Sequence, residues 1–253
     1  MTGIYLIGGG WAPHGLHATF EPFVRAAGGA SARIVCVLLR GVGQRVAFPA
    51  YAAALRAAGA AAVTPVFVSS AQPLRADALV GATGILVGGG VTPAYHRALC
   101  PTAAEWLPLL HAHGIPYAGY SAGAMIAAEI ALLGGWKALT PTGERRLVAR
   151  AFGEGLSYLT CRPGLGLVPF LVDVHAVQWG TTARLQQAVA TGWADEGWAI
   201  DEGTLVEVRD ATATVHGLGR ARRARLLAGV VTVETLGAGA VRRLAAWERP
   251  GER

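Results

Sequence analysis

The sequence has little charge and almost no lysine. Charged residues make up 15% of the chain, Lys137 is the only lysine, and the net charge of +6 therefore comes from arginine. Because disordered chains combine low hydrophobicity with high charge, a hydrophobic content of 53% predicts a folded chain with a sizeable core. The length would fit one large domain or two small ones, but no linker is visible. We expect a single α/β domain over residues 1–253, with 210–253 as a C-terminal β extension.

Long hydrophobic runs and paired cysteines are also missing. The longest apolar stretch, residues 119–136, is short for a membrane span and contains Glu129, so we expect a buried helix there and no membrane partner. The cysteines, Cys36, Cys100 and Cys161, are far apart and odd in number, which favours a reduced, cytoplasmic setting over a disulfide framework. No basic leader opens the chain, so a signal peptide is not expected.

Arginine is dense in one segment only. No aromatic platform or recognition helix accompanies this cluster, so we expect no nucleic-acid partner. A solvated face, or a charged loop over an anionic substrate, is the preferred interpretation. The cluster consists of Arg220, Arg222, Arg223 and Arg225.

Short apolar runs alternate with amphipathic runs over residues 3–140. Strands that alternate with helices form a parallel sheet with covered faces. We therefore predict an α/β fold with a mostly parallel sheet sandwiched by helices and extra C-terminal β-strands. The expected strands are 4–7, 32–39, 62–68, 84–87 and 115–119, and the expected helices are 19–27, 49–58, 76–80, 93–99 and 103–113.

The second half of the chain is less regular. A hairpin is expected to turn at Asp210-Ala211, and exposed late strands would allow a homodimer. The extended segments expected here are 165–170, 171–175, 198–209, 213–217 and 230–235, with one helix at 181–190.

Gly119-Tyr120-Ser121-Ala122-Gly123 stands between an apolar strand and an apolar helix. A serine between glycines at such a junction is the pattern of a nucleophile elbow. The glycines allow a sharp turn, and the helix N-terminus directs unpaired N–H groups towards an oxyanion. Ser121 is therefore the candidate nucleophile. The alternative is a glycine-rich turn with an incidental serine.

A serine nucleophile needs a base and an orienting acid. His175 ends an extended run, so it can reach a sheet edge, although a partly buried structural histidine would fit the same pattern. Asp201 and Glu202 lie within an expected strand, where alternation puts them on opposite faces, so only one of them can easily meet the imidazole. Asp173 is two residues from His175 and could form a local hydrogen bond instead of orienting the imidazole.

Gly8-Gly9-Gly10 and Gly88-Gly89-Gly90 both follow expected strands, which places them with Ser121 around one crevice. The second segment lacks the lysine of a phosphate-binding loop, and we expect no cofactor. The N–H of Gly89 or Gly90, together with that of Ala122, would form an oxyanion hole. His14 and His17 have no third ligand nearby, so no metal is expected.

These segments resemble the peptidase E and cyanophycinase family of serine peptidases, which have the class I glutamine amidotransferase-like fold. The likeness covers residues 84–90, 119–124, 173–185 and 200–204, in the family's order. It implies that Ser121 is the nucleophile, His175 the base and Glu202 the third member, with Asp201 as the alternative acid. It also implies a small peptide or amide as the substrate.

The chain departs from this family where acidic substrates would bind. Trp179 and Thr181 stand where the family carries arginines, and only Arg184 remains. Because bidentate arginine pairing is hard to replace, Asp-X dipeptides and cyanophycin are doubtful substrates. An apolar or aromatic group is expected instead. The substrate-binding candidates are Thr92, Tyr95, Trp179 and Arg184.

Two other functions stay open. An esterase of the α/β-hydrolase type would need the order serine, acid, histidine, for which His216 is the only histidine after Asp201. A catalytically weak or inactive homologue that binds a small molecule or peptide would use the same scaffold.

Overall fold

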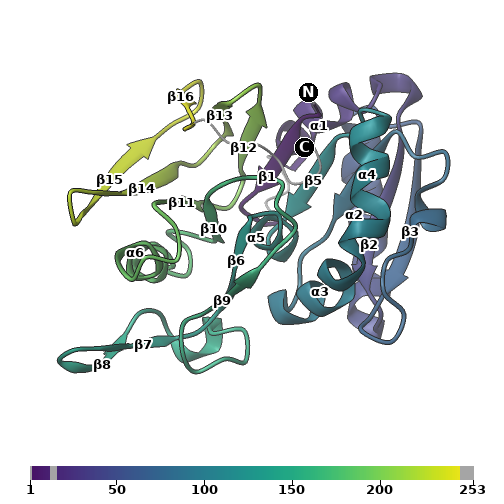
Figure 1. Ribbon diagram of the computed structural model, residues 1–253. Helices are drawn as coiled ribbons and strands as arrows, with labels where there is room; N and C mark the ends of the chain where they lie inside the picture. Colours follow the sequence, from purple (N-terminus) through teal and green to yellow (C-terminus); the bar gives the residue numbers. More distant parts are fainter. Residues whose placement is uncertain (1, 12–15, 246–253) are drawn as a thin grey trace.

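Two β-sheets organise the structure, a computed structural model that describes residues 2–11 and 16–245 (Figure 1). The larger sheet has eight strands, and five of them form a parallel half in the order β1-β5-β4-β2-β3. These strands are β1 (Ile4–Ile7), β2 (Arg33–Leu39), β3 (Ala62–Val68), β4 (Gly84–Val87) and β5 (Tyr117–Tyr120). The predicted mostly parallel α/β sheet is confirmed.

The antiparallel half continues the same sheet beyond β1. β12 (Thr204–Arg209) pairs with β1, β13 (Thr212–Gly217) with β12, and β16 (Val241–Arg243) with β13. The predicted turn at Asp210-Ala211 is present, with positive φ at both residues, as a two-residue hairpin turn requires.

The second sheet has the order β10-β11-β14-β15. Its strands are β10 (Leu171–Val174), β11 (Glu196–Ile200), β14 (Ala221–Leu227) and β15 (Val230–Leu236), and α6 (Thr182–Ala190) packs against it. The single strand expected over 198–209 is wrong, because the chain leaves β11 at residue 201 and enters β12 in the other sheet. The extended segment expected over 165–170 forms no strand, because the N–H groups of Leu165 and Leu167 bond to the carbonyls of Ile126 and Ala127 at the end of α5, and only Val168 makes an isolated bridge, with Ala128.

Helices cover both faces of the large sheet. Tyr5 and Ile7 of β1 belong to one hydrophobic cluster, whereas Ile4 and Leu6 belong to the other, as the alternation of a strand requires. The first cluster includes residues of α1 (Leu16–Ala26) and α2 (Val42–Ala57), and the second includes residues of α3 (Thr92–Leu99), α4 (Ala103–Ala112) and α5 (Ala122–Ile126). α2 begins before the expected residue 49, so packing of its buried face outweighs the cost of an interior proline.

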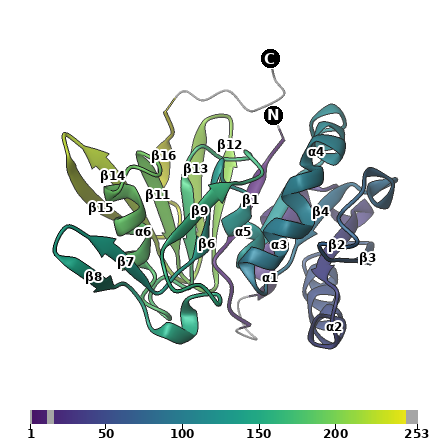
Figure 2. The same ribbon diagram turned by 60° about the horizontal axis from the view of Figure 1, so that its bottom comes forward.

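The buried helix expected over residues 119–136 is much shorter than predicted. α5 ends at Ile126, and the chain continues into β6 (Ile130–Gly134), which pairs with β9 (Thr160–Pro163). Between them, β7 (Lys137–Thr140) and β8 (Gly143–Arg146) form a hairpin that projects from the body in both views (Figures 1 and 2). Within the described ranges, no helix is both long enough and apolar enough to cross a membrane.

Candidate active site

Ser121 sits in a sharp turn between β5 and α5. Its backbone is strained, with φ of 52° and ψ of −112°, and its side chain is buried. A Cβ at Gly119 would overlap the Gly123 carbonyl, and one at Gly123 would overlap the Val87 carbonyl. The two glycines of the pentapeptide are therefore required by close backbone approach, which the sequence pattern predicted.

Three side chains from distant segments meet at this turn. Ser121 Oγ lies 3.0 Å from His175 Nε2, and His175 Nδ1 lies 2.7 Å from Glu202 Oε1. Ser121 follows β5, His175 follows β10 and Glu202 follows β11, so the carboxyl ends of strands from both sheets converge here. The structure thus brings together the three residues that the family resemblance implied.

Asp201 lies away from the imidazole. Its carboxylate accepts hydrogen bonds from the N–H groups of Val177 at 3.1 Å and Arg220 at 3.0 Å, and from Arg222 Nη1 at 2.6 Å. Because neighbouring residues leave a strand on opposite sides, Glu202 faces His175 and Asp201 faces β14. The alternative acid is therefore engaged in holding the second sheet to the segment that carries Glu202.

The first triple-glycine segment supports the histidine and the acid. Gly8 accepts a hydrogen bond from the His175 N–H at 3.1 Å, and Gly9 accepts one from the Gly203 N–H at 2.9 Å. A Cβ at Gly9 would overlap the imidazole, and one at Gly10 would overlap the Glu202 side chain. The sequence placed these glycines at the shared crevice but gave no sign of which side chains they accommodate.

Burial favours the neutral form of the His175 imidazole. Desolvation lowers its pKa below the ordinary value, and the Glu202 carboxylate acts in the opposite direction. A neutral imidazole whose Nδ1–H donates to Glu202 presents the lone pair of Nε2 to the Ser121 hydroxyl. This tautomer can accept the serine proton.

The Gly89 N–H is engaged within the protein. It donates to the Tyr51 hydroxyl at 2.8 Å, while the Gly89 carbonyl accepts from Gln44 Nε2 at 3.0 Å and from the Tyr95 hydroxyl at 3.3 Å. The Ala122 and Gly90 N–H groups donate to no acceptor in residues 2–11 and 16–245. Of the three predicted oxyanion-hole donors, the N–H groups of Ala122 and Gly90 are therefore the two that the described residues leave unused.

Three of the four substrate-binding candidates are buried in the interior. Arg184 is 1% exposed, and its guanidinium donates to both Asp173 oxygens, from Nε at 2.8 Å and Nη2 at 2.7 Å. Tyr95 and Thr92 are fully buried. The prediction that these side chains contact substrate is not supported, because α3 and α6 direct them into the core rather than towards Ser121.

Trp179 is half-buried and stacked. Its ring lies 3.7 Å from that of His175 with an interplanar angle of 13°, and 4.8 Å from that of Phe152 with an angle of 6° (centroid distances). The tryptophan is thus at the site, as predicted, but it contacts the histidine itself.

An aromatic group that the sequence did not predict packs on Tyr120, the residue before Ser121. Trp11, which follows the first triple glycine, lies 4.6 Å from the Tyr51 ring and 5.3 Å from the Tyr120 ring, and it is 43% exposed. The buried Tyr120 hydroxyl has no hydrogen-bond partner among the described residues. A tryptophan directly after a glycine loop was the only signal for this group.

His216 and His96 bond to groups other than Ser121. His216 Nε2 lies 3.0 Å from Glu207 Oε2, and His96 Nε2 lies 2.8 Å from the Pro163 carbonyl. The serine–acid–histidine order of the esterase alternative is therefore not assembled. His14 and the side chain of His17 lie outside what the structure describes, and the part of the chain that is described contains no group of three or more metal-ligating side chains.

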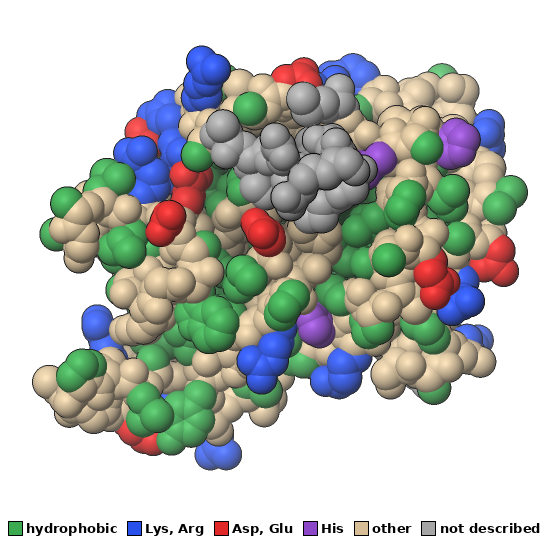
Figure 3. Space-filling model, viewed as in Figure 1, with side chains coloured by type: hydrophobic (Ala, Val, Ile, Leu, Met, Phe, Trp, Pro, Cys, Tyr) green, Lys and Arg blue, Asp and Glu red, His purple; other side chains and the backbone are tan. Residues whose placement is uncertain are grey.

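The arginine cluster forms part of a strand rather than a loop. In β14, Arg222 pairs with Asp201 at 2.6 Å, and Arg223 pairs with Glu196 at 2.6 Å. On the face shown in Figure 3, basic side chains gather over the C-terminal strands with acidic ones between them. Half of the cluster is thus neutralised within the second sheet.

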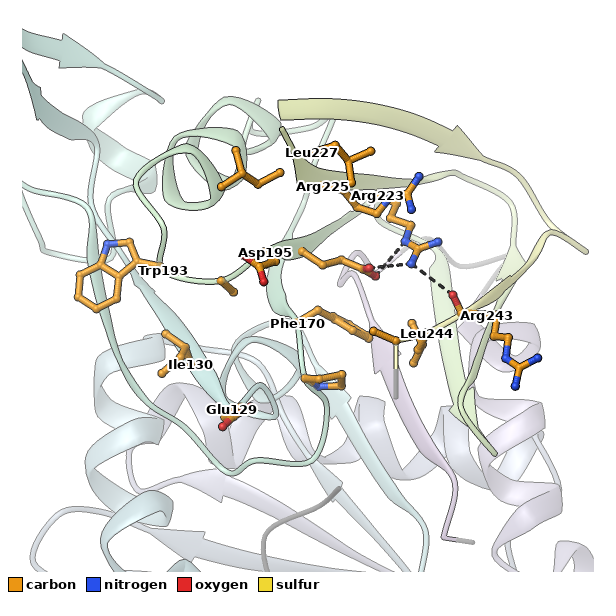
Figure 4. Close-up of a pocket in the computed structure, with 15 residues that line it drawn as sticks. Glu129, Ile130, Phe170, Trp193, Asp195, Arg223, Arg225, Leu227, Arg243 and Leu244 are labelled. Carbon is orange, nitrogen blue, oxygen red and sulfur yellow. Dashed lines mark hydrogen bonds and ion pairs between the residues drawn. The ribbon is translucent and has the colours of Figure 1, made fainter. Parts of the chain in front are cut away.

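A cavity of about 960 Å³ lies at the other end of the second sheet (Figure 4). It is lined by Phe170, just before β10, and by Glu196 at the start of β11, with the Arg223–Glu196 ion pair in its wall. β10 and β11 are parallel, and His175 and Glu202 follow their opposite ends. This cavity is therefore separate from the candidate active site.

The comparisons with known proteins agree with this geometry. Residues 50–216 match the model of Peptidase family S51, which is more than half of the chain, and the protein belongs to this family. It is therefore a serine peptidase in general terms, and the resemblance to peptidase E is confirmed.

Solved structures share the fold at low sequence identity. A peptidase from an acI-B1 Actinobacterium has a TM-score of 0.62 and 15% identity, covering 96% of this chain and 97% of that one. A putative peptidase E protein from Listeria monocytogenes EGD-e has a TM-score of 0.55 and 17% identity, covering 87% of this chain and 100% of that one. No curated protein sequence matches the chain.

Proposed function

We propose that the protein hydrolyses a small peptide or related amide through Ser121, His175 and Glu202. The observation that carries this proposal is the unbroken hydrogen-bonded relay from Ser121 Oγ through both imidazole nitrogens to Glu202 Oε1, at the N-terminus of α5. A serine hydroxyl, a neutral imidazole and a carboxylate in this order form the arrangement that activates a serine.

In the first half of the reaction, His175 Nε2 accepts the Ser121 proton as Oγ attacks the substrate carbonyl carbon. The carbonyl oxygen becomes an oxyanion, which the N–H groups of Ala122 and Gly90 can stabilise. His175 then gives the proton to the departing amine, and the C–N bond breaks to leave an ester on Ser121. Glu202 remains ionised and stabilises the transient imidazolium.

In the second half, His175 Nε2 accepts a proton from water as the water oxygen attacks the Ser121 ester. The proton returns to Ser121 Oγ as the ester bond breaks, which releases the carboxylic acid and restores the enzyme.

We infer that the acyl side of the substrate is neutral. The guanidinium of Arg184 is buried and fully paired, so it offers no fork to an aspartyl carboxylate. Aromatic side chains flank the triad, because Trp11 packs on Tyr120, the residue before Ser121, and Trp179 stacks on His175. A substrate with an apolar or aromatic group suits this environment better than an acidic one.

The direct test compares wild type with Ser121→Ala on a panel of dipeptides and on p-nitrophenyl acetate. We expect turnover by wild type only, with unchanged thermal unfolding of the variant. A fluorophosphonate should label wild type at Ser121 and leave the variant unlabelled. Equal hydrolysis by both proteins would contradict the proposal. A folded wild type that neither turns over nor labels would support the binding homologue instead.

A further inference from the structure

Both faces of the Trp179 indole are occupied. His175 and Phe152 each lie nearly parallel to it, with ring centroids at 3.7 and 4.8 Å. Two rings lying on the same face at these centroid distances would overlap each other sideways, so they lie on opposite faces. The indole is a flat spacer between a phenyl ring and the imidazole, and it has no face left to stack on a substrate ring.

The outer end of this stack is fixed to the protein interior. The Phe152 carbonyl accepts a hydrogen bond from Arg184 Nη1 at 2.8 Å, and the rest of that guanidinium is held by Asp173. Arg184 and Asp173 are 1% and 0% exposed. Since Asp173 belongs to β10, the strand that ends just before His175, the same strand anchors both ends of the stack.

Hydrogen bonds also hold the backbone of residues 174–181, which carries the Trp179 indole. The Trp179 N–H donates to the His175 carbonyl at 2.8 Å, and Thr181 Oγ1 donates to the Val174 carbonyl at 2.7 Å. The backbone of His175 has a φ of 53°, a value that residues other than glycine seldom adopt. These bonds keep the residue in a conformation that directs its ring towards Ser121.

The imidazole needs such support. Its hydrogen bonds to Ser121 and Glu202 leave from the two nitrogens, so they allow the ring to tip about the line that joins those partners. A flat surface against one ring face removes this freedom. We propose that Trp179 is a positioning residue, backed by Phe152, that fixes the plane of the His175 imidazole; this rests on the proposed function of the triad.

The test uses the full chain and three substitutions of Trp179. Trp179→Ala removes the surface, Trp179→Leu fills part of the volume without a flat ring, and Trp179→Phe restores a ring. Trp193→Ala is the matched control, because Trp193 is 41% exposed and lines the cavity at the far end of the second sheet. The readouts are kcat and KM for phenylalanyl-alanine and alanyl-alanine, and the rate of fluorophosphonate labelling.

We expect Trp179→Ala and Trp179→Leu to lower kcat and the labelling rate by about 10- to 100-fold, because small misplacement of a catalytic group has effects of this size. KM and the ratio between the two dipeptides should change less than about threefold, and Trp179→Phe should recover most of the rate. A rise in KM confined to phenylalanyl-alanine would instead make Trp179 a substrate contact and overturn the proposal. Wild-type rates in both Ala and Leu variants would also overturn it.

A second readout does not depend on turnover. In wild type, the short Nδ1–H bond to Glu202 should give a strongly deshielded proton resonance in the NMR spectrum, absent in Glu202→Gln. We expect it to broaden or disappear in Trp179→Ala and Trp179→Leu, and to persist in Trp179→Phe and Trp193→Ala. If the resonance is unchanged in all four, the indole does not position the ring. If wild type shows the resonance but no activity, the proposed function fails; the inference then stands if Trp179→Ala and Trp179→Leu lose the resonance and fails if they keep it.

Discussion

Asp201 and Glu202 are adjacent in sequence, yet their carboxylates bond to side chains from different strands of the second sheet, Arg222 in β14 and His175 directly after β10. Glu202 Oε1 lies 2.7 Å from His175 Nδ1, whereas Asp201 Oδ1 lies 2.6 Å from Arg222 Nη1. Glu202 therefore has a chemical role, and Asp201 has a structural one. Substitution of Glu202 should lower activity, whereas substitution of Asp201 should lower stability.

We predict that Glu202→Gln lowers kcat by about 100-fold or more while leaving stability nearly unchanged, because the imidazolium loses its counter-charge in a position that is partly exposed. Asp201→Asn should lower the free energy of unfolding by about 3 kcal/mol, because Arg222 loses its partner in a largely buried ion pair. Steady-state kinetics and urea unfolding of both variants check this. A stable Asp201→Asn protein with a larger loss of kcat than Glu202→Gln would show that the roles are reversed.

The pH dependence of kcat/KM should report the His175 imidazole. Burial lowers its pKa below 6.5, and only the neutral form accepts the serine proton. The value of kcat/KM should therefore fall as the pH drops through a value below 6.5, and it should not change with pH just above neutrality. Glu202 raises this pKa, so Glu202→Gln should shift the acidic limb to a still lower pH. Profiles for wild type and variant on a neutral dipeptide provide the measurement, and a wild-type limb centred above pH 7 would be inconsistent with it.

Arg184 should behave as a structural residue. We predict that Arg184→Lys lowers the free energy of unfolding by about 3 kcal/mol, because an ammonium cannot replace the fork that bonds both Asp173 oxygens. The double variant Asp173→Leu/Arg184→Leu removes both charges and should regain part of that loss. Urea unfolding checks the stabilities. If Arg184→Lys instead retained full stability and raised KM for dipeptides, the arginine would have to reach the substrate.

The parallel half of the fold was predictable because its strands are short apolar runs that alternate with helical segments. Residues 62–68 and 84–87 read as apolar runs bounded by turn residues, and β3 and β4 have those bounds. β14 escaped prediction because three arginines interrupt its apolar pattern. Two of them are neutralised by Asp201 and Glu196, and such pairing is visible only once the strands lie side by side.

The site was predictable where local sequence dictates geometry. The elbow glycines specify the turn at Ser121, and strand alternation required that Asp201 and Glu202 diverge. Arg184 was misassigned because a single charged residue on a helix gives no sign of a buried partner. The sequence predicted that Trp179 lies at the site. That both faces of its ring are covered follows only from the positions of Phe152 and His175 in the fold.

Gly9 offers a test of how tightly the imidazole is enclosed. Its φ is +93°, and an added Cβ would overlap the His175 ring. Gly59 is the matched control, because its φ is +105° and nothing lies within 4 Å of an added Cβ. Both alanine variants should lose about 1 kcal/mol of stability from backbone strain.

Only Gly9→Ala should also lose activity, by about 100-fold in kcat, because its methyl group displaces the base from Ser121. Thermal unfolding and dipeptide kinetics on the two variants separate the backbone effect from the steric one. Equal activity in Gly9→Ala and Gly59→Ala would mean that the imidazole can move away from Gly9 and still accept the serine proton, which the close packing against Trp179 argues against.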